Sequence, residues 1–556
     1  MTKHKNCVAS VYRLTEDHIP SFWLNKECPH IRVTNVLSEE VKDWDAHTPV
    51  LIDAPVGLGK TTLVKEVIYP LAKSRQQNIV IVGNRIALSL QQKIAFLKKA
   101  NSKYLRILSE EGIAEQKVFD DLAILTYQSL PQFIKDMEKN SETKKWLENV
   151  GFVVADEIHF FTSDASFNYK CDFILETLIS KFPKAVRIYM TATPWDIIFP
   201  LSEAEERLYT NVSEDVICKS NHIFQLPRRG ILYHFERDYS QYTLCFFEDI
   251  NEITEKIKSD KETKWLIFID KKNRLNDITS DLIDKPIYLD AAQKDSDDFK
   301  KLIRSEQFDG QVLVSTSVLD CGVNIIDGQL KNIVVFSDDR TSIMQMAGRK
   351  RLQENENVTL WIHIPSNKSI ASRCCNYNVF LEFDDEYANR VEQLELAPKK
   401  PYQAFHDLTT KIWNHPRTEL HLLFQVSGNR IYKNRLAFFK MRRKVDFYNK
   451  ILGGQTTFQH EVEDWFMKPH ADCHSALEAL DLFYEEHRKQ LLDEQEQATL
   501  REVIIATHKE AGKTQSRTDR NDTLGVNALN NLLTEIKSSY HIERINTQFW
   551  GLFKKQ

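Results

Sequence analysis

A loop that could cradle phosphate follows the first strongly apolar run of the chain. Residues 49–52 (PVLI) precede APVGLGKTT, in which a small residue, four intervening positions and then Gly, Lys and Thr match a phosphate-binding loop. Glycines let successive backbone N–H groups turn toward an anion, and the helix that follows aims its positive end at the same point. The loop positions expected to contact a nucleotide are Ala54, Pro55, Val56, Gly57, Leu58, Gly59, Lys60, Thr61 and Thr62.

Two of these side chains have a defined chemical task in such a loop. Lys60 would neutralise oxygens of the β- and γ-phosphates, and the Thr61 hydroxyl would be one ligand of Mg²⁺. Ala54 stands where many such loops carry Gly, and a strand-to-helix turn with an incidental lysine is the alternative. The apolar run before the loop and the amphipathic run after it favour the nucleotide site, with ATP and Mg²⁺ as the predicted cofactors.

A second candidate for chemistry is the pair of acids in GFVVADEIHF, residues 151–160. In open parallel sheets, ligands collect outside the carboxyl ends of the strands, where Asp156 and Glu157 would lie. We expect Asp156 to hold Mg²⁺, directly or through water, and Glu157 to orient and deprotonate the attacking water. Two acids capping a helix N-terminus are the alternative, which is less favoured downstream of a phosphate loop.

The elements that must position these residues alternate along the chain. Short Val/Ile/Leu runs separated by amphipathic stretches occupy residues 35–193 and again residues 230–365, and runs that are apolar on both faces indicate parallel sheets covered by helices. Residues 195–229 form an irregular connector, and long amphipathic stretches follow residue 365. The predicted strands are residues 49–53, 78–83, 123–127, 151–156 and 185–193, then 263–270, 286–290, 311–316, 332–337 and 358–364.

Length and composition limit the class of protein. A chain of 556 residues is expected to form two to four domains, and 42% hydrophobic with 28% charged residues is an ordinary globular composition. Apolar runs are too short to cross a bilayer and the first ten residues lack a secretory signal, so no membrane partner and a cytoplasmic location are expected. The nine cysteines are scattered without a C-x-x-C pair, which argues against a zinc ribbon.

The motifs, taken in order, resemble those of superfamily 2 helicases and translocases. Residues 156–159 (DEIH) resemble the DExH box, and residues 190–194 (MTATP) resemble the motif that links hydrolysis to domain movement. Two further segments resemble the first two motifs that contact the nucleic acid, residues 82–89 (VGNRIALS) and 124–130 (ILTYQSL). Residues 265–270 (WLIFID), 312–325 (VLVSTSVLDCGVNI) and 345–351 (QMAGRKR) resemble the fourth, fifth and sixth motifs. The resemblance covers about residues 35–365 and implies two tandem RecA-like P-loop domains.

The resemblance also implies roles for individual residues. Gly322 and Asn324 would help to bind the nucleotide, and His159, Thr191 and Thr193 would couple hydrolysis to movement, with His159 bridging to Gln345 across the cleft. Gln345 and Arg349 fall on matching positions of the sixth motif, and Arg349 would act as the arginine finger. This chain then departs from the usual pattern, because Arg351 precedes Leu352 where Gly and a second arginine are expected. Arg351 either takes the second arginine's role or points to solvent.

A nucleic-acid partner is expected to bind through its phosphates, because a motor that travels along any sequence grips the backbone. The net charge of −5 gives no global attraction, so binding must come from local surfaces. The candidate contacts are Arg85, Thr126, Lys271 and Thr316, and DNA is preferred over RNA as the partner. The basic and aromatic run at residues 429–450 is either a second strand-contacting surface or a packed helix with solvated cations.

The expected organisation is an N-terminal segment at 1–34, an ATP-binding RecA-like domain at 35–215, a second RecA-like domain at 216–368 and a helical accessory domain at 369–556. Within the last, residues 528–556 read as a helix followed by short β-strands. The predicted activity is ATP hydrolysis coupled to translocation along, and unwinding of, DNA or RNA. A translocase of a restriction, defence or remodelling system and a partner-controlled ATPase switch are the alternatives. The GRKR form of the sixth motif resembles that of viral and plasmid replication helicases, the herpesvirus origin-binding type included.

Overall fold

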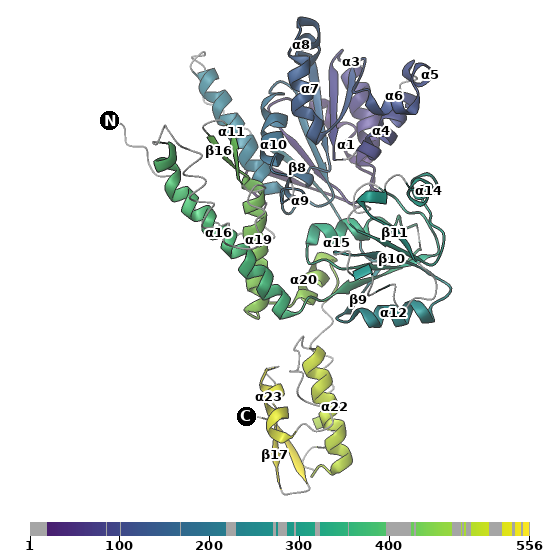
Figure 1. Cartoon of the computed structure of the whole chain (residues 1–556), viewed down its shortest axis with the longest axis vertical. Helices are drawn as coiled ribbons and strands as arrows, with labels where there is room; N and C mark the ends of the chain where they lie inside the picture. The colour runs from purple at the N-terminus through teal and green to yellow at the C-terminus, as the bar shows by residue number, and fades with distance from the viewer. Residues whose placement is uncertain are drawn as a thin grey trace. The chain divides into compact units, whose positions relative to one another are not determined.

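The computed structural model divides the chain into two compact units, Met1–Leu452 and Gly453–Gln556, which we describe separately. Figure 1 shows the elements of each unit. The structure describes the chain from residue 19 onward except for residues 85, 100–101, 167, 218–229, 271–273, 276–277, 279–285, 294–295, 317–322, 354, 396–423, 428–429, 470–479, 481–482, 485–486, 488–490, 511–524, 536–539, 546–548 and 555–556.

The first unit contains an eight-stranded sheet in the order β1-β8-β2-β7-β6-β3-β5-β4. Neighbouring strands pair in parallel except β4 and β5. The central strands are Val/Ile-rich and every residue of β2, β6 and β7 is buried, as a sheet covered on both faces requires. The strands are β1 (Trp23–Cys28), β2 (Val50–Asp53), β3 (Asn78–Gly83), β4 (Val118–Phe119), β5 (Leu122–Thr126), β6 (Val150–Asp156), β7 (Val186–Thr191) and β8 (Gly230–Phe235).

A second, six-stranded sheet in the same unit has the order β11-β12-β10-β13-β14-β9, and its pairs are all parallel. Its strands are β9 (Tyr242–Phe247), β10 (Lys264–Phe268), β11 (Ile287–Leu289), β12 (Val312–Ser315), β13 (Leu330–Val335) and β14 (Val358–His363). All ten predicted strands are present. The expected α/β class with two tandem, mainly parallel sheets is confirmed.

Helices connect the strands of both sheets. Around the first sheet they are α1 (Val33–Leu37), η1 (Glu40–Asp43), α2 (Lys60–Leu63), η2 (Val64–Ile68), α3 (Tyr69–Ser74), α4 (Ile86–Lys99), α5 (Tyr104–Ile107), α6 (Glu110–Glu115), η3 (Tyr127–Ser129), α7 (Leu130–Met137), α8 (Ser141–Glu148), α9 (Phe160–Ser163), α10 (Cys171–Ser180) and α11 (Ile198–Ile217). The second sheet is accompanied by α12 (Ile250–Ser259), η4 (Ala291–Gln293), α14 (Asp297–Ser305) and α15 (Arg340–Ala347).

Two expected domain boundaries need correction. The division at residue 216 assigned Gly230–Phe235 to the second domain, whereas this strand lies between β1 and β2 in the first sheet. The segment 1–34 was set apart from the ATP-binding domain, whereas β1 forms the edge of that domain's sheet. The polar residues of β1 are exposed, as an edge strand allows, so β1 carries no buried apolar run that would have marked it as a strand.

The region after residue 365 is also more divided than expected. Helix α16 (Asn367–Glu395), the antiparallel hairpin of β15 (Phe424–Ser427) and β16 (Arg430–Lys433), and α19 (Arg435–Leu452) belong to the first unit. Figure 1 shows α16 and α19 in green, side by side. The helical region expected at 369–556 is present but divided, because its first part, as far as Leu452, belongs to the compact unit that contains the two sheets.

Helix α19 joins the two sheet-containing halves of the first unit through ion pairs. Arg435, its first residue, donates its backbone N–H to Asp172 and pairs its guanidinium with Glu176, and both acids are on α10. Arg443 lies 3.2 Å from Asp196, which also belongs to the first half. On the second half, Lys444 Nζ lies 3.3 Å from carboxylate oxygens of both Asp338 and Asp339. These contacts pair several cations of the basic run at 429–450 with acids of the same protein. This pairing favours the packed-helix alternative.

We expect Lys444→Met to lower the free energy of unfolding of the first unit by about 3 kcal/mol, because removing one partner of a buried ion pair leaves the other uncompensated. Lys444 is largely buried, and Asp338 also accepts a hydrogen bond of 2.6 Å from the Tyr448 hydroxyl. Urea unfolding followed by tryptophan fluorescence measures the change. Lys450→Met, in the last turn of the same helix, is the matched control, and equal midpoints for the two variants would show that the pair contributes no stability.

The second unit has a small core of its own. It contains α20 (Phe458–Trp465), α22 (Glu494–Glu510), α23 (Val526–Glu535) and the antiparallel hairpin of β17 (Tyr540–Arg544) and β18 (Trp550–Lys554). The helix and short strands expected at 528–556 are present. Apolar residues of α22, α23 and the hairpin form one cluster, which includes Leu500, Leu529 and Trp550. None of the helices among the described residues of the chain has the length and hydropathy needed to span a bilayer.

Candidate nucleotide site

The predicted phosphate loop leaves the carboxyl end of the central strand β2. The Ala54 N–H donates to the Thr191 carbonyl at 3.1 Å, which ties the start of the loop to the neighbouring strand β7. Gly57 and Gly59 have φ values of 95° and 88°, a left-handed backbone that side chains with a Cβ rarely adopt. Gly59 is the N-cap of the helix that begins at Lys60, and this helix continues through η2 and α3 to Ser74.

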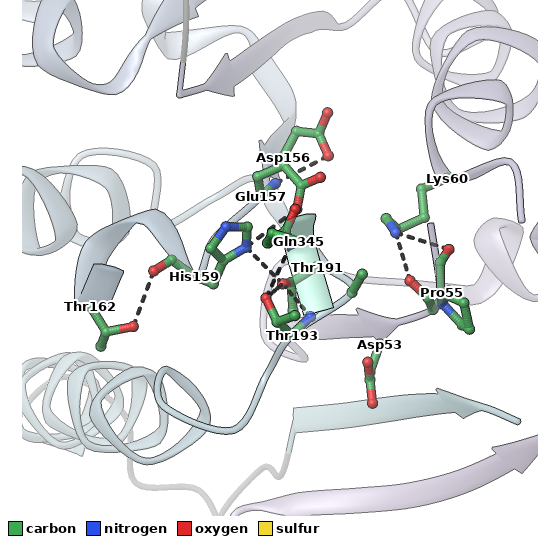
Figure 2. A network of polar contacts seen from close by, with 12 residues as sticks. Asp53, Pro55, Lys60, Asp156, Glu157, His159, Thr162, Thr191, Thr193 and Gln345 are labelled. Carbon is green, nitrogen blue, oxygen red and sulfur yellow. Dashed lines mark hydrogen bonds and ion pairs between the residues drawn. The ribbon is translucent and has the colours of Figure 1, made fainter. Parts of the chain in front are cut away.

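Lys60 is buried inside this loop. Figure 2 shows its ammonium group directed at the loop's own backbone, where it donates to the carbonyls of Ala54 at 2.6 Å and Pro55 at 3.3 Å. Burial lowers the pKa of Lys60, and the charges of Glu157 and Asp156 oppose that shift. A buried cation beside two left-handed glycines and the end of a helix fits an anionic phosphate, so the residues present suit the nucleotide that the sequence predicts.

The two acids stand at the end of β6, where they were expected. Glu157 has a φ of 53°, and its N–H donates to the Asp156 carboxylate at 3.1 Å. Glu157 Oε2 lies 3.3 Å from Nδ1 of His159, which is 3% exposed. Burial would raise the pKa of Glu157, but the hydrogen bond and charge of His159 outweigh burial and hold the pKa below its ordinary value. The carboxyl group is therefore ionised at neutral pH, as a base must be.

We expect His159→Asn to move the acidic limb of the pH profile of kcat from below pH 4 into the range above it, because burial raises the pKa of Glu157 once the hydrogen bond and charge of His159, which lower that pKa to about 2, are removed. The ionised carboxylate is the active form, so a raised pKa protonates more of the enzyme at a given acidic pH and activity is lost earlier as pH falls. Steady-state ATP hydrolysis measured between pH 4 and pH 8 tests this. His30→Asn, at an exposed histidine that contacts the Glu236 carbonyl, is the control and should keep the wild-type profile.

A chain of polar contacts leads from the acids to the second sheet. His159 Nδ1 lies 3.1 Å from the Thr191 hydroxyl, which accepts a hydrogen bond of 2.9 Å from the Thr193 N–H. The Thr193 hydroxyl accepts from Gln345 Nε2 at 3.3 Å, and Gln345 is on α15 of the second half. The expected bridge from His159 to Gln345 thus runs through the two threonines, which Figure 2 shows between them.

The two arginines of the sixth motif have different surroundings. Arg349 is 3% exposed, and it donates to the backbone oxygen of Gln345 at 2.9 Å and to its side-chain oxygen at 3.0 Å. Arg351 donates to Asn324 Oδ1 at 2.8 Å. A Cβ placed on Gly57 would lie 3.7 Å from Arg351 Nη1, so this guanidinium reaches the phosphate loop. Burial and the charge of Arg349 lower the pKa of Arg351 to about 10.

The site contains contacts that motif spacing did not predict. Asp53, the last residue of β2, is buried and pairs with His234 Nδ1 at 2.6 Å and with Arg237. The guanidinium groups of Arg237 and Arg340 lie 5.2 Å and 3.9 Å from the ring centroid of Trp195. These partners are separated by more than 40 positions along the sequence, so only the fold brings them together.

The structure describes some of the residues predicted to contact the nucleic acid. Thr126 ends β5 and forms a capping box with Ser129, and the N–H of Thr316 donates to the Leu289 carbonyl at 3.2 Å. Arg85, Lys271 and Gly322 lie outside the described residues. The structure therefore brings together the phosphate loop, the acids, the threonines and the sixth motif. The residues expected to contact the nucleic acid stay a prediction.

Comparison with known proteins supports the motif assignment. The family model described as "Type III restriction enzyme, res subunit" matches residues 28–196. Among solved structures, Saccharomyces cerevisiae Dbp5 bound to RNA and ADP BeF3 is 12% identical, with a TM-score of 0.39 and coverage of 57% of this chain and 80% of that one. The Mycobacterium smegmatis helicase Lhr bound to ssDNA and AMP-PNP is 15% identical, with a TM-score of 0.40 and coverage of 61% and 46%.

A further similar structure is the DUF1998 helicase MrfA bound to DNA and AMPPNP, at 13% identity, a TM-score of 0.42 and coverage of 72% and 59%. No curated protein matches the chain. Since these structural similarities are low, the assignment rests on the family match and on the motifs, which the fold places around one loop. Residues 28–196 are similar to the res subunit of type III restriction enzymes, and this similarity agrees with the phosphate loop, the paired acids and the ordered motifs.

Proposed function

We propose that this protein couples the hydrolysis of Mg²⁺-bound ATP to movement along nucleic acid, with DNA as the preferred track, and that it separates the strands. The observation that carries the proposal is the hydrogen bond of 3.3 Å from Gln345, in the sixth motif, to Thr193, in the motif at residues 190–194. This contact joins the two halves of the first unit beside the buried acids. A change at the nucleotide can therefore alter how the two halves are held together.

The geometry of the site supports a proposed role for each residue. The backbone of residues 54–59 and the Lys60 ammonium would bind the phosphates, and the Thr61 hydroxyl and Asp156 would hold Mg²⁺, whose chemistry when bound is to neutralise phosphate charge. Glu157 would take the proton of the attacking water, because its carboxyl is ionised and held beside His159. Arg349 and Arg351, supplied by the second half, would stabilise the charge that develops on the phosphoryl oxygens.

The threonine chain would report the state of this site to the second half. Thr191 contacts His159, and Thr193 contacts Gln345, so a movement of Glu157 and His159 changes a contact that spans both halves. Thr126 and Thr316 would hold the backbone of the strand, together with Arg85 and Lys271. Such a grip on phosphates is independent of base sequence, as a translocating enzyme requires.

The test is steady-state ATP hydrolysis by the purified full chain, alone and with single-stranded DNA, duplex DNA or RNA at one fixed salt concentration. Stimulation of more than about tenfold by a DNA would support the proposal. Stimulation by RNA alone would overturn the DNA assignment, and equal rates under all conditions would overturn the motor in favour of a partner-controlled ATPase. A strand-displacement assay then separates an unwinding enzyme from a translocase that leaves the duplex intact.

A further inference from the structure

The backbone at Glu157 is held in an unfavourable conformation. Its φ of 53° lies in the left-handed region, which a residue with a long side chain adopts only when its surroundings impose it. Both peptides that flank Glu157 are anchored by partners from other elements. The N–H of Ile158 donates to the Met190 carbonyl of β7 at 3.0 Å, and the carbonyl of Asp156 accepts a hydrogen bond of 2.7 Å from the hydroxyl of Tyr127.

Tyr127 is fully buried against the same turn. Its ring stacks on Phe160 with the centroids 5.1 Å apart and the planes at 5°, and it meets Phe161 edge-on at 4.6 Å. Burial and the charges of Asp156 and Glu157 raise the pKa of the Tyr127 hydroxyl well above its ordinary value, so the hydroxyl keeps its proton and remains a donor. The ring and the hydroxyl of one residue thus fix the backbone before Glu157 and the side chains after His159.

The backbone of Tyr127 is in turn fixed by its neighbours. Thr126 and Ser129 form a reciprocal capping box around it, in which the Thr126 N–H donates to the Ser129 hydroxyl at 3.2 Å. The Ser129 hydroxyl donates to the Thr126 carbonyl at 3.0 Å. Thr126 is a proposed contact for the nucleic acid. Because Thr126 directly precedes Tyr127 in the chain, nucleic acid bound at Thr126 would act on the backbone of Tyr127.

We propose that Tyr127 is a positioning residue that holds the strained turn of Glu157 in its hydrolytic geometry and transmits strand binding at Thr126 to that turn. The inference rests on the proposed function and deepens it, because it names a physical connection from the track to the base. A hydroxyl that fixes a peptide plane affects the orientation of Glu157 and leaves the phosphate loop untouched. Its removal therefore affects turnover and leaves nucleotide affinity unchanged.

Tyr127→Phe tests the hydroxyl alone, since the ring and its stacking on Phe160 remain. We expect kcat in the presence of the stimulating nucleic acid to fall about tenfold, with KM for ATP unchanged and a smaller ratio of stimulated to basal rate. Tyr69→Phe is the matched control, because Tyr69 is also buried and donates to Asp121 at 3.1 Å near the start of β5. Its kcat, KM and ratio should stay at the wild-type values.

Turnover is expressed per site that binds a non-hydrolysable ATP analogue, which removes the effect of any misfolded fraction. If Tyr127→Phe has fewer binding sites but wild-type turnover and wild-type stimulation per site, Tyr127 serves packing only and the inference is overturned. If wild-type protein shows no stimulation by any nucleic acid, the proposed function fails first, and a fall in the basal kcat of Tyr127→Phe still measures the effect on the turn. An unchanged basal kcat in that case overturns the positioning role as well.

Discussion

Lys60→Ala should reduce ATP hydrolysis by on the order of 10³-fold, to the background of the assay. The Lys60 ammonium is buried and is held by two backbone carbonyls of its own loop, so it lies where the phosphates would replace those partners. Alanine removes the positive charge from a site that already contains the acids Asp156 and Glu157. The phosphates of ATP would then meet two negative groups without the cation that offsets them.

Steady-state phosphate release measures this effect, and equilibrium binding of a fluorescent ATP analogue shows how much of the loss is affinity. Lys73→Ala is the control, because Lys73 is an exposed lysine on α3 of the same continuous helix. Lys73→Ala should keep the wild-type rate. Wild-type hydrolysis by Lys60→Ala would mean that the phosphate loop is not the hydrolytic site, and the roles proposed for Glu157, Arg349 and Arg351 would fail with it.

Arg349→Ala should slow turnover by on the order of 10³-fold while ATP still binds, because an arginine finger acts on charge that appears only in the transition state. In the structure, Arg349 is fixed by two hydrogen bonds to Gln345, and Arg351 reaches the phosphate loop beside Gly57. We therefore expect Arg351→Ala to slow turnover as well and also to raise KM, since its guanidinium lies beside the loop that holds the nucleotide.

The two variants are compared by kcat and KM in the same preparation, with Arg304→Ala as the control at an exposed arginine in the last turn of α14. Arg304→Ala should match the wild type in both constants. If Arg349→Ala turns over normally and Arg351→Ala does not, the finger is Arg351 and Arg349 only supports Gln345. Normal turnover by both variants would remove the second half from the hydrolytic mechanism.

Much of the fold could be predicted because its strands are buried on both faces. Runs such as residues 150–155, in which every residue is buried, carry no polar side chain and are therefore visible in the sequence. The edge strand β1 could not be predicted in this way, because it carries exposed polar residues and therefore has no continuous apolar run. The placement of β8 could not be predicted because it pairs with strands about 200 positions away, which no local pattern records.

The residues of the candidate site also fall into those that the sequence could predict and those that it could not. Lys60, Asp156 and Glu157 belong to contiguous motifs at strand ends, so their types and spacing were enough to place them. The pairing of Asp53 with Arg237 and the contact of Arg340 with Trp195 join distant segments, and the residues themselves are ordinary in sequence. The same holds for α19, whose sequence fits either a nucleic-acid surface or a packed helix, because the partners of Lys444, Asp338 and Asp339, lie in a distant segment.

The position of β8 between β1 and β2 has a consequence for how the protein is made. Among the described residues β1 pairs with β8 alone, so β1 leaves the ribosome without this partner until residues 230–235 have followed it. Asp53, beside the phosphate loop, likewise waits for His234 and Arg237. The sheet that carries the phosphate loop therefore cannot be complete when only residues 28–196 have been synthesised. A fragment ending at residue 196 should leave β1 unpaired and Asp53 buried without a counter-charge.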